Sequence, residues 1–135
     1  MSLQFSTSYR NQLLDLLETV AGTSPKLVFL TGSAPANCAA AETGTRVAVA
    51  TLPADWMNDA ASGQKTLKGT WEDADADATG TAGYFRLYDS AGTTCHVQGT
   101  VTLTGSGGDI TLDNTNIQIH QDVKENSFTL TAPGA

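Results

Sequence analysis

Apolar residues recur near the N-terminus at the spacing of one face of a helix. This pattern predicts a helix over residues 6–21, whose main turns span 9–22 after an N-terminal arm of residues 1–8. Ser6 or Ser8 can cap its start. Its apolar face comprises Tyr9, Leu13, Leu16, Leu17 and Val20, and its opposite face Arg10, Gln12, Asp15 and Thr19. Since one helix of this length is marginal alone, we expect the apolar face to pack on a sheet or on a neighbouring subunit.

After this helix the period of the pattern changes to two, which is typical of strands. We expect strands at residues 26–32, 45–53, 64–73, 82–90, 93–105, 109–114, 116–123 and 126–132. Many short strands separated by turn-forming residues are typical of a β-sandwich or jelly roll. The sequence therefore predicts a single all-β domain over residues 1–135, with a sandwich over 26–132 and the helix packed on it.

Alternation along the strands assigns side chains to faces. Phe85 and Leu87 are expected to point inward, and Tyr84, Arg86 and Tyr88 to lie on the second face. One face of the next strand is expected to hold Cys95, Val97, Gly99, Val101 and Leu103. Later core candidates are Ile110, Leu112, Ile117 and Ile119. The Gly-rich segment TGSGGDIT joins two strands and is expected to form a hairpin loop.

Composition limits the partners. The 135 residues carry a formal net charge of −7, without a cluster of Lys or Arg, which disfavours nucleic acid as a partner. The polar N-terminus predicts no secretory signal, and the short apolar runs predict no membrane span.

Three aspartates at alternate positions form the first candidate site. Asp73, Asp75 and Asp77 resemble the start of a calcium-binding loop. The pattern then departs from an EF-hand, because Ala78 stands at the glycine position and Tyr84 at that of the bidentate glutamate. The segment is either an acidic, solvated loop or a weak divalent-cation site completed by a neighbouring subunit. We expect no cofactor.

The cysteines and histidines form no catalytic pattern. Cys38 and Cys95 are either two buried thiols or a disulfide formed after release from a cell. Cys95 and His96 are adjacent in a strand, so they point to opposite faces and cannot act as nucleophile and base. His96 and His120 lack the further ligands that a metal site needs. No nucleophile-elbow, phosphate-loop or zinc-protease motif occurs, so we expect a protein that is not an enzyme.

Aromatic residues are the candidates for contact with a partner. Trp71, Tyr84 and Tyr88 either fill a second core layer or stack on a sugar ring or anchor another protein. Phe5 and Tyr9 of the N-terminal segment complete this set of interface candidates.

Long stretches of the chain resemble a family of small tailed-bacteriophage virion proteins. They are RNQLLDLLETVAGTSPKLVFLTGSAPANCAAAETGT, LPADWM, GTAGYFRLYDSAGTTCHVQGTV and GGDITLDNTNI. The resemblance covers most of the chain. Within this family, the chain resembles capsid cement or decoration proteins. It implies no catalytic residue.

The resemblance implies a non-enzymatic structural protein of the virion, assembled in the host cytoplasm, which binds and stabilises the head shell. The implied partners are the major capsid protein and the protein itself, as a dimer or trimer, with no nucleic acid or membrane. The alternative is a tail-tip, fibre or baseplate module that binds a host surface glycan. A third reading is a connector or tail-completion protein.

Overall fold

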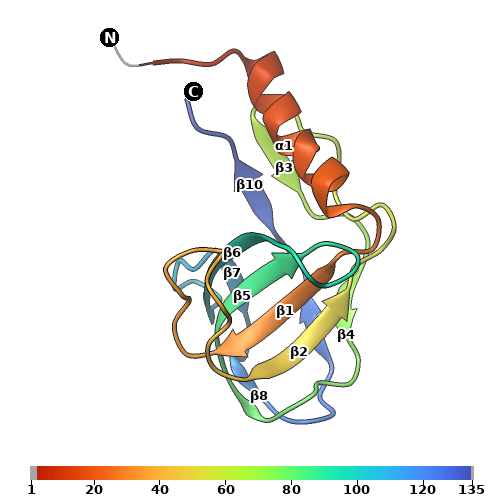
Figure 1. Ribbon diagram of the computed structural model, residues 1–135, viewed down its shortest axis with the longest axis vertical. Coiled ribbons are helices and arrows are strands. Elements are labelled where there is room, and N and C mark those ends of the chain that lie inside the picture. Colours follow the sequence, from red (N-terminus) through yellow and green to blue (C-terminus); the bar gives the residue numbers. More distant parts are fainter. Residues whose placement is uncertain (1–2, 135) are drawn as a thin grey trace.

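The computed structural model describes residues 3–134, which contain one helix followed by ten strands (Figure 1). The elements are α1 (Thr7–Ala21), β1 (Lys26–Thr31), β2 (Arg46–Thr51), β3 (Gln64–Thr66), β4 (Trp71–Asp73), β5 (Gly80–Tyr88), β6 (Cys95–Leu103), β7 (Ile110–Leu112), β8 (Asn116–Ile117), β9 (Val123–Glu125) and β10 (Thr129–Thr131). The prediction of a chain made mostly of strands with one N-terminal helix is confirmed. Its arrangement as a sandwich or jelly roll stays a prediction.

The main sheet places β1 and β5 at its centre. Its strand order is β2-β1-β5-β6-β7, and β8 also pairs with β5. Figure 1 shows this sheet curling in the lower half of the molecule, with α1, β3 and β10 above it. β6 and β7 are parallel, with Val101 opposite Ile110, so the Gly-rich segment between them is not the predicted hairpin loop.

The main core lies between this sheet and two small sheets, β3 with β10 and β4 with β9. Phe85 and Leu87 point into it, as the alternation predicts. The ring of Phe128 lies 5.5 Å from that of Trp71 and 5.9 Å from that of Phe85, so aromatic packing joins the small sheets to the main one.

One predicted strand is divided in the structure and another ends early. Residues 64–73 form two strands, β3 and β4, which belong to different sheets. The strand predicted at 116–123 ends at Ile117, because the chain turns at His120, whose φ is 71°. Ile119 is consequently 51% exposed and does not belong to the core as expected.

A register shift in β6 changes the face on which Cys95 lies. Leu87 pairs with Val97 while Tyr88 pairs with Cys95, so His96 is an extra residue in this ladder. Val97 packs against the main core, whereas Cys95 packs against the second cluster, which includes Tyr88. The prediction that Cys95 and Val97 share a face is therefore wrong. Leu103, predicted on the same face, is 49% exposed.

The first residues of α1 follow the predicted capping pattern. Ser6 Oγ accepts a hydrogen bond from the Tyr9 amide at 3.1 Å, and Gly22, with a φ of 82°, ends the helix. Only one edge of the predicted apolar face packs on the body. Leu17 and Ala21 contact the core, whereas Tyr9, Leu13, Leu16 and Val20 are exposed.

A buried lysine holds the polar side of α1 against the body. The Lys65 side chain, on β3, is fully buried, and its Nζ lies 2.6 Å from both Asp15 Oδ1 and Glu18 Oε1. Burial works to lower the pKa of Lys65, but hydrogen bonds to Asp15 and Glu18 outweigh it and raise that pKa. The bond from Lys65, followed by one from the Ala60 amide, lowers the pKa of Asp15. The inner face of α1 is therefore held by charge pairing.

Arg10 makes a second polar contact between α1 and the body. Its Nη2 donates to the carbonyl oxygen of Ala132, beyond β10, at 2.8 Å. The guanidinium packs directly over Gly63, where an added Cβ would lie 2.4 Å from the Arg10 Cζ. Gly63 also has a φ of 72°, so glycine is required there for two reasons.

Lys65→Ala is expected to lower the free energy of unfolding by about 3 kcal/mol, because it removes a buried side chain and leaves two carboxylates unpaired. Lys68→Ala is the matched control. Lys68 pairs with Asp55 at 2.5 Å, but both side chains are more than half exposed. Its loss should leave the free energy of unfolding almost unchanged. Urea denaturation measures both values, and equal losses would contradict the role of Lys65.

Candidate interaction surface

The outer face of α1 exposes a continuous apolar stripe, formed by Tyr9, Leu13, Leu16 and Val20. Their side chains are 49%, 38%, 53% and 47% exposed, respectively. These four and Leu3 make up five of the seven large exposed hydrophobic residues in the described part of the chain. Exposed apolar side chains gathered in this way mark a contact site more often than the same residues scattered singly.

The N-terminal arm extends the stripe. Phe5 packs edge-on against Tyr9, with ring centroids 5.1 Å apart, so two of the predicted interface candidates lie together. The Phe5 amide donates to the carbonyl oxygen of Gly134 at 2.8 Å. The arm is thus fixed to the C-terminal segment at the start of α1.

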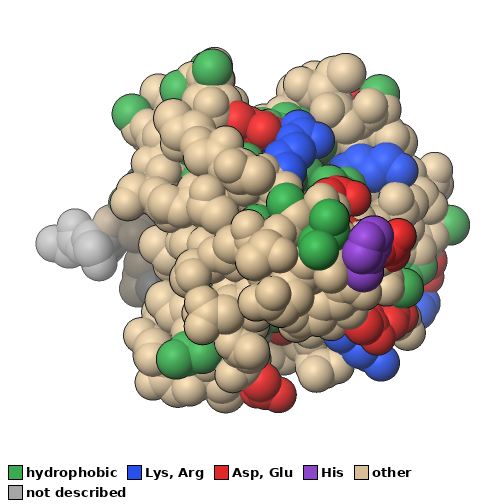
Figure 2. Space-filling model, turned by 90° about the horizontal axis from the view of Figure 1, so that it is seen from below, with side chains coloured by type: hydrophobic (Ala, Val, Ile, Leu, Met, Phe, Trp, Pro, Cys, Tyr) green, Lys and Arg blue, Asp and Glu red, His purple; other side chains and the backbone are tan. Residues whose placement is uncertain are grey.

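No charged side chain of α1 lies on the stripe. Gln12 and Thr19 border it, and the three charged residues of the helix, Arg10, Asp15 and Glu18, point to the body, where Ala132 and Lys65 bind them. The distant end of the molecule differs. Figure 2 views it from below and shows acidic and basic side chains near one another, with scattered hydrophobic side chains between them.

Trp71, Tyr84 and Tyr88, the other interface candidates, are buried inside the chain. Segment 33–44 covers the second face of β5, and the Tyr84 hydroxyl donates to the Thr43 carbonyl oxygen at 2.6 Å. Tyr88 donates to Glu42 in the same segment. These rings fill core layers and are not available to a sugar or another protein on this surface.

Arg86 anchors the same segment. Its Nη2 donates to the carbonyl oxygens of Ala40 and Asn37 at 2.8 and 3.1 Å. Glu42 also binds Arg46 at 2.6 Å, and this bond, more than that from Tyr88, lowers the pKa of Glu42. A polar network thus joins segment 33–44 to this face of the sheet.

The aspartate-rich loop does not gather its carboxylates. Asp73 caps backbone amides, accepting from Val49 at 2.8 Å and from Asp75 at 3.0 Å. The Asp75 carboxylate lies 2.6 Å from His120 Nδ1, with both side chains about three-quarters exposed, and Asp77 is exposed. Among residues 3–134 no three His, Cys, Asp or Glu side chains are arranged to hold a metal ion.

The two cysteines meet beside the second core cluster. Both are half-buried free thiols. Burial, followed by a hydrogen bond with Cys38, raises the pKa of Cys95 to about 12. Cys95 Sγ also donates to the Val97 carbonyl oxygen at 3.5 Å.

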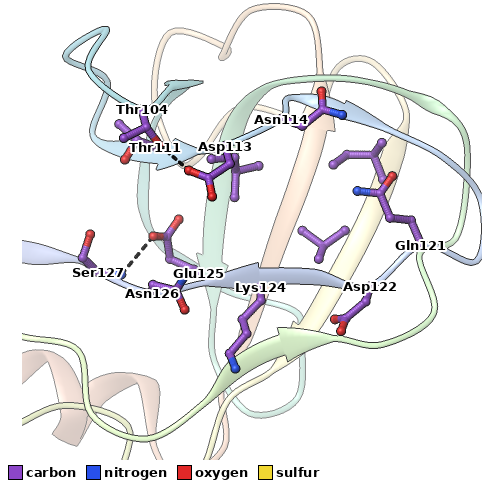
Figure 3. A pocket seen from close by; sticks show the side chains of 13 residues that line it. Thr104, Thr111, Asp113, Asn114, Gln121, Asp122, Lys124, Glu125, Asn126 and Ser127 are labelled. Carbon is purple, nitrogen blue, oxygen red and sulfur yellow. Dashed lines mark hydrogen bonds between the residues drawn. The ribbon is translucent and has the colours of Figure 1, made fainter.

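A pocket that the sequence did not indicate lies between β7 and β9. It has a volume of about 410 Å³, and its floor comprises Leu112, Ile117 and Val123. Figure 3 shows the Glu125 carboxylate pointing toward Asp113, while Lys124 on the same strand points the other way. Glu125 is 3% exposed.

One oxygen of this glutamate has no partner. Glu125 Oε1 accepts from the Ser127 amide at 3.1 Å, whereas Oε2 is buried without a hydrogen bond. Burial is the main cause that raises the pKa of Glu125, and the charge of Asp113 adds to it. The signal in the sequence was the alternation itself, which places Glu125 on the same inward side of β9 as Val123.

Cys95 is expected to react with iodoacetamide at pH 8 at least about a hundredfold more slowly in the folded protein than in urea, because its high pKa leaves little thiolate. Peptide mass spectrometry over time follows each cysteine. Equal rates in the folded and unfolded chain would contradict the burial of this thiol.

Glu125→Gln is expected to raise the free energy of unfolding at pH 7 by about 1–2 kcal/mol, because it removes a buried charge with an unpaired oxygen. Because the pKa of Glu125 is raised in the folded state, the contribution of this one group to stability is fully present below its ordinary pKa of 4.5 and is lost as pH rises through the folded-state value. The gain should therefore vanish near pH 3. Asp77→Asn, at an exposed aspartate outside the pocket, is the control and should change little. A loss of stability in Glu125→Gln at pH 7 would show that Glu125 is paired.

No helix in residues 3–134 has the length and apolarity required to cross a membrane. Comparison with known proteins finds no protein-family model, no curated protein and no solved structure that matches this chain.

Proposed function

We propose that this protein is a non-enzymatic structural protein of a tailed-phage virion, a capsid cement protein that binds the major capsid protein and further copies of itself. The resemblance of the sequence supplies the setting. The exposed apolar stripe on α1 is the observation that carries the proposal of an assembly role. A β-sandwich or jelly-roll classification of the strands belongs to the same proposal.

The stripe supports an assembly role for an energetic reason. Covering roughly 300 Å² of apolar surface contributes about 7 kcal/mol before the entropy cost of association. The polar contacts through Lys65 and Arg10 hold α1 in place, so the stripe cannot turn inward without breaking them. Many copies on one shell would add such modest contacts into strong clamping.

The glycan-binding alternative has less support. It requires exposed aromatic rings, and Trp71, Tyr84 and Tyr88 are buried. The aspartate-rich loop would have to bind a calcium ion at such a site. Its Asp73 carboxylate instead accepts hydrogen bonds from backbone amides.

Phage heads that lack this protein are expected to release their DNA at a lower temperature than complete heads, and to release it earlier when salt is removed. Added purified protein should restore the stability of complete heads. Release of DNA, measured with an intercalating dye during heating, reports this. Equal stability of both heads would count against a cement role.

Cryo-electron microscopy of the virion supplies an independent control on location. Regular density over the head lattice is expected. Density confined to the tail tip would overturn the proposal in favour of the glycan-binding module.

A further inference from the structure

The four residues of the apolar stripe follow the spacing of a coiled-coil seam. Tyr9, Leu13, Leu16 and Val20 are separated by four, three and four positions, as alternating d and a positions of a heptad are. At 3.6 residues per turn they lie within about 60° of one another around the helix axis. So narrow a stripe fits the groove of another helix better than a broad flat surface.

The spacing is also the same when it is read in either direction. A two-fold axis between Leu13 and Leu16 brings Tyr9 of one copy opposite Val20 of the other, and Leu13 opposite Leu16. Along the seam, the larger Tyr9 side chain then always faces the smaller Val20, and each leucine faces a leucine. A parallel pair would instead place Tyr9 on Tyr9 and Val20 on Val20, with unequal volumes along the seam. The antiparallel pair also opposes the two helix dipoles.

The absence of charge on the stripe permits a second copy as the occupant. Each chain has a net charge of −7, so two copies repel one another over most of their surface. The stripe and its borders, Gln12 and Thr19, are uncharged, because the acidic and basic residues of α1 bind the body. A strongly basic partner would find no carboxylate on this face.

We infer that α1 pairs with α1 of a second copy of this chain, antiparallel and through the apolar stripe. This inference concerns the isolated protein and does not depend on its place in a virion. A helix of 15 residues is about 22 Å long, so the pair buries less surface than a standard interface. The expected dissociation constant is on the order of 10–100 µM. Added salt is expected to tighten the dimer, because it screens the repulsion between the two acidic copies.

Sedimentation velocity of the full chain, from about 5 to about 500 µM, tests the pairing. Leu16→Asp places two like charges beside the two-fold axis and should weaken the dimer at least about a hundredfold. Leu103→Asp introduces the same charge at a leucine that is 49% exposed on β6, and it should leave the dimer unchanged. Leu16→Gln, a milder change at a 53% exposed position, keeps the test valid if the aspartate variant does not fold.

Cysteine cross-linking tests the direction of the pair. A mixture of Tyr9→Cys and Val20→Cys chains should form a disulfide between the two introduced thiols when oxidised glutathione is added, with release of two glutathione thiols per bond formed. Each variant alone should cross-link at least about tenfold less. Peptide mapping separates these bonds from any at Cys38 or Cys95.

These experiments separately test the direction of the helix pair, its two-fold symmetry and its existence. Self-linking of Tyr9→Cys alone would overturn the antiparallel arrangement, and a trimer mass would overturn the two-fold pair. A monomer at every concentration, or equal dimerisation of Leu16→Asp and wild type, would overturn the pairing altogether. The cement role would survive these results, because head stability and the position of the protein on the virion are measured separately.

Discussion

The burial of the Lys65 ammonium group determines which side of α1 faces the body and which side is exposed. Lys65 lies inside the molecule, and a buried cation is tolerated only when carboxylates compensate for the water it has lost. Asp15 and Glu18 supply that compensation at 2.6 Å, and both lie on the polar side of α1. The helix therefore has to place its polar side inward, and its leucines are left on the surface.

This constraint explains why the sequence predicted the helix but left open whether its apolar face packs on the sheet or on a neighbouring subunit. The existence of α1 depends on local features, the Ser6 cap and the Gly22 stop, which lie within the segment itself. Its orientation depends on Lys65, which is 50 positions from Asp15 in the chain. Helical periodicity reports an apolar face but not the partner that covers it. The extra residue in β6 is a similar case, because period-two alternation contains no mark of a bulge.

The candidate sites were predictable to different degrees. Phe5 and Tyr9, both predicted as interface candidates, pack together next to the exposed stripe, and their role in an interface stays a prediction. Tyr84 and Tyr88 were assigned to the correct face of β5, but nothing in the strand pattern indicated that segment 33–44 folds over that face. Glu125 was missed because the sequence analysis placed residues 124–125 between two predicted strands, whereas the structure forms β9 over Val123–Glu125.

The position of the chain ends has a practical consequence for protein engineering. Figure 1 shows the described part of the N-terminal arm and the segment after β10 on the side of α1, and Phe5 binds Gly134 directly. An affinity tag or a fluorescent protein fused at either end would sit next to the helix and obstruct its contacts. Ser90, just before β6, donates to the carbonyl oxygen of Ala21 at the end of α1. The turn at 104–107 lies at the other end of β6. Added side-chain atoms at Gly105 and Gly107 meet open space, so this turn is the better place to insert a displayed peptide.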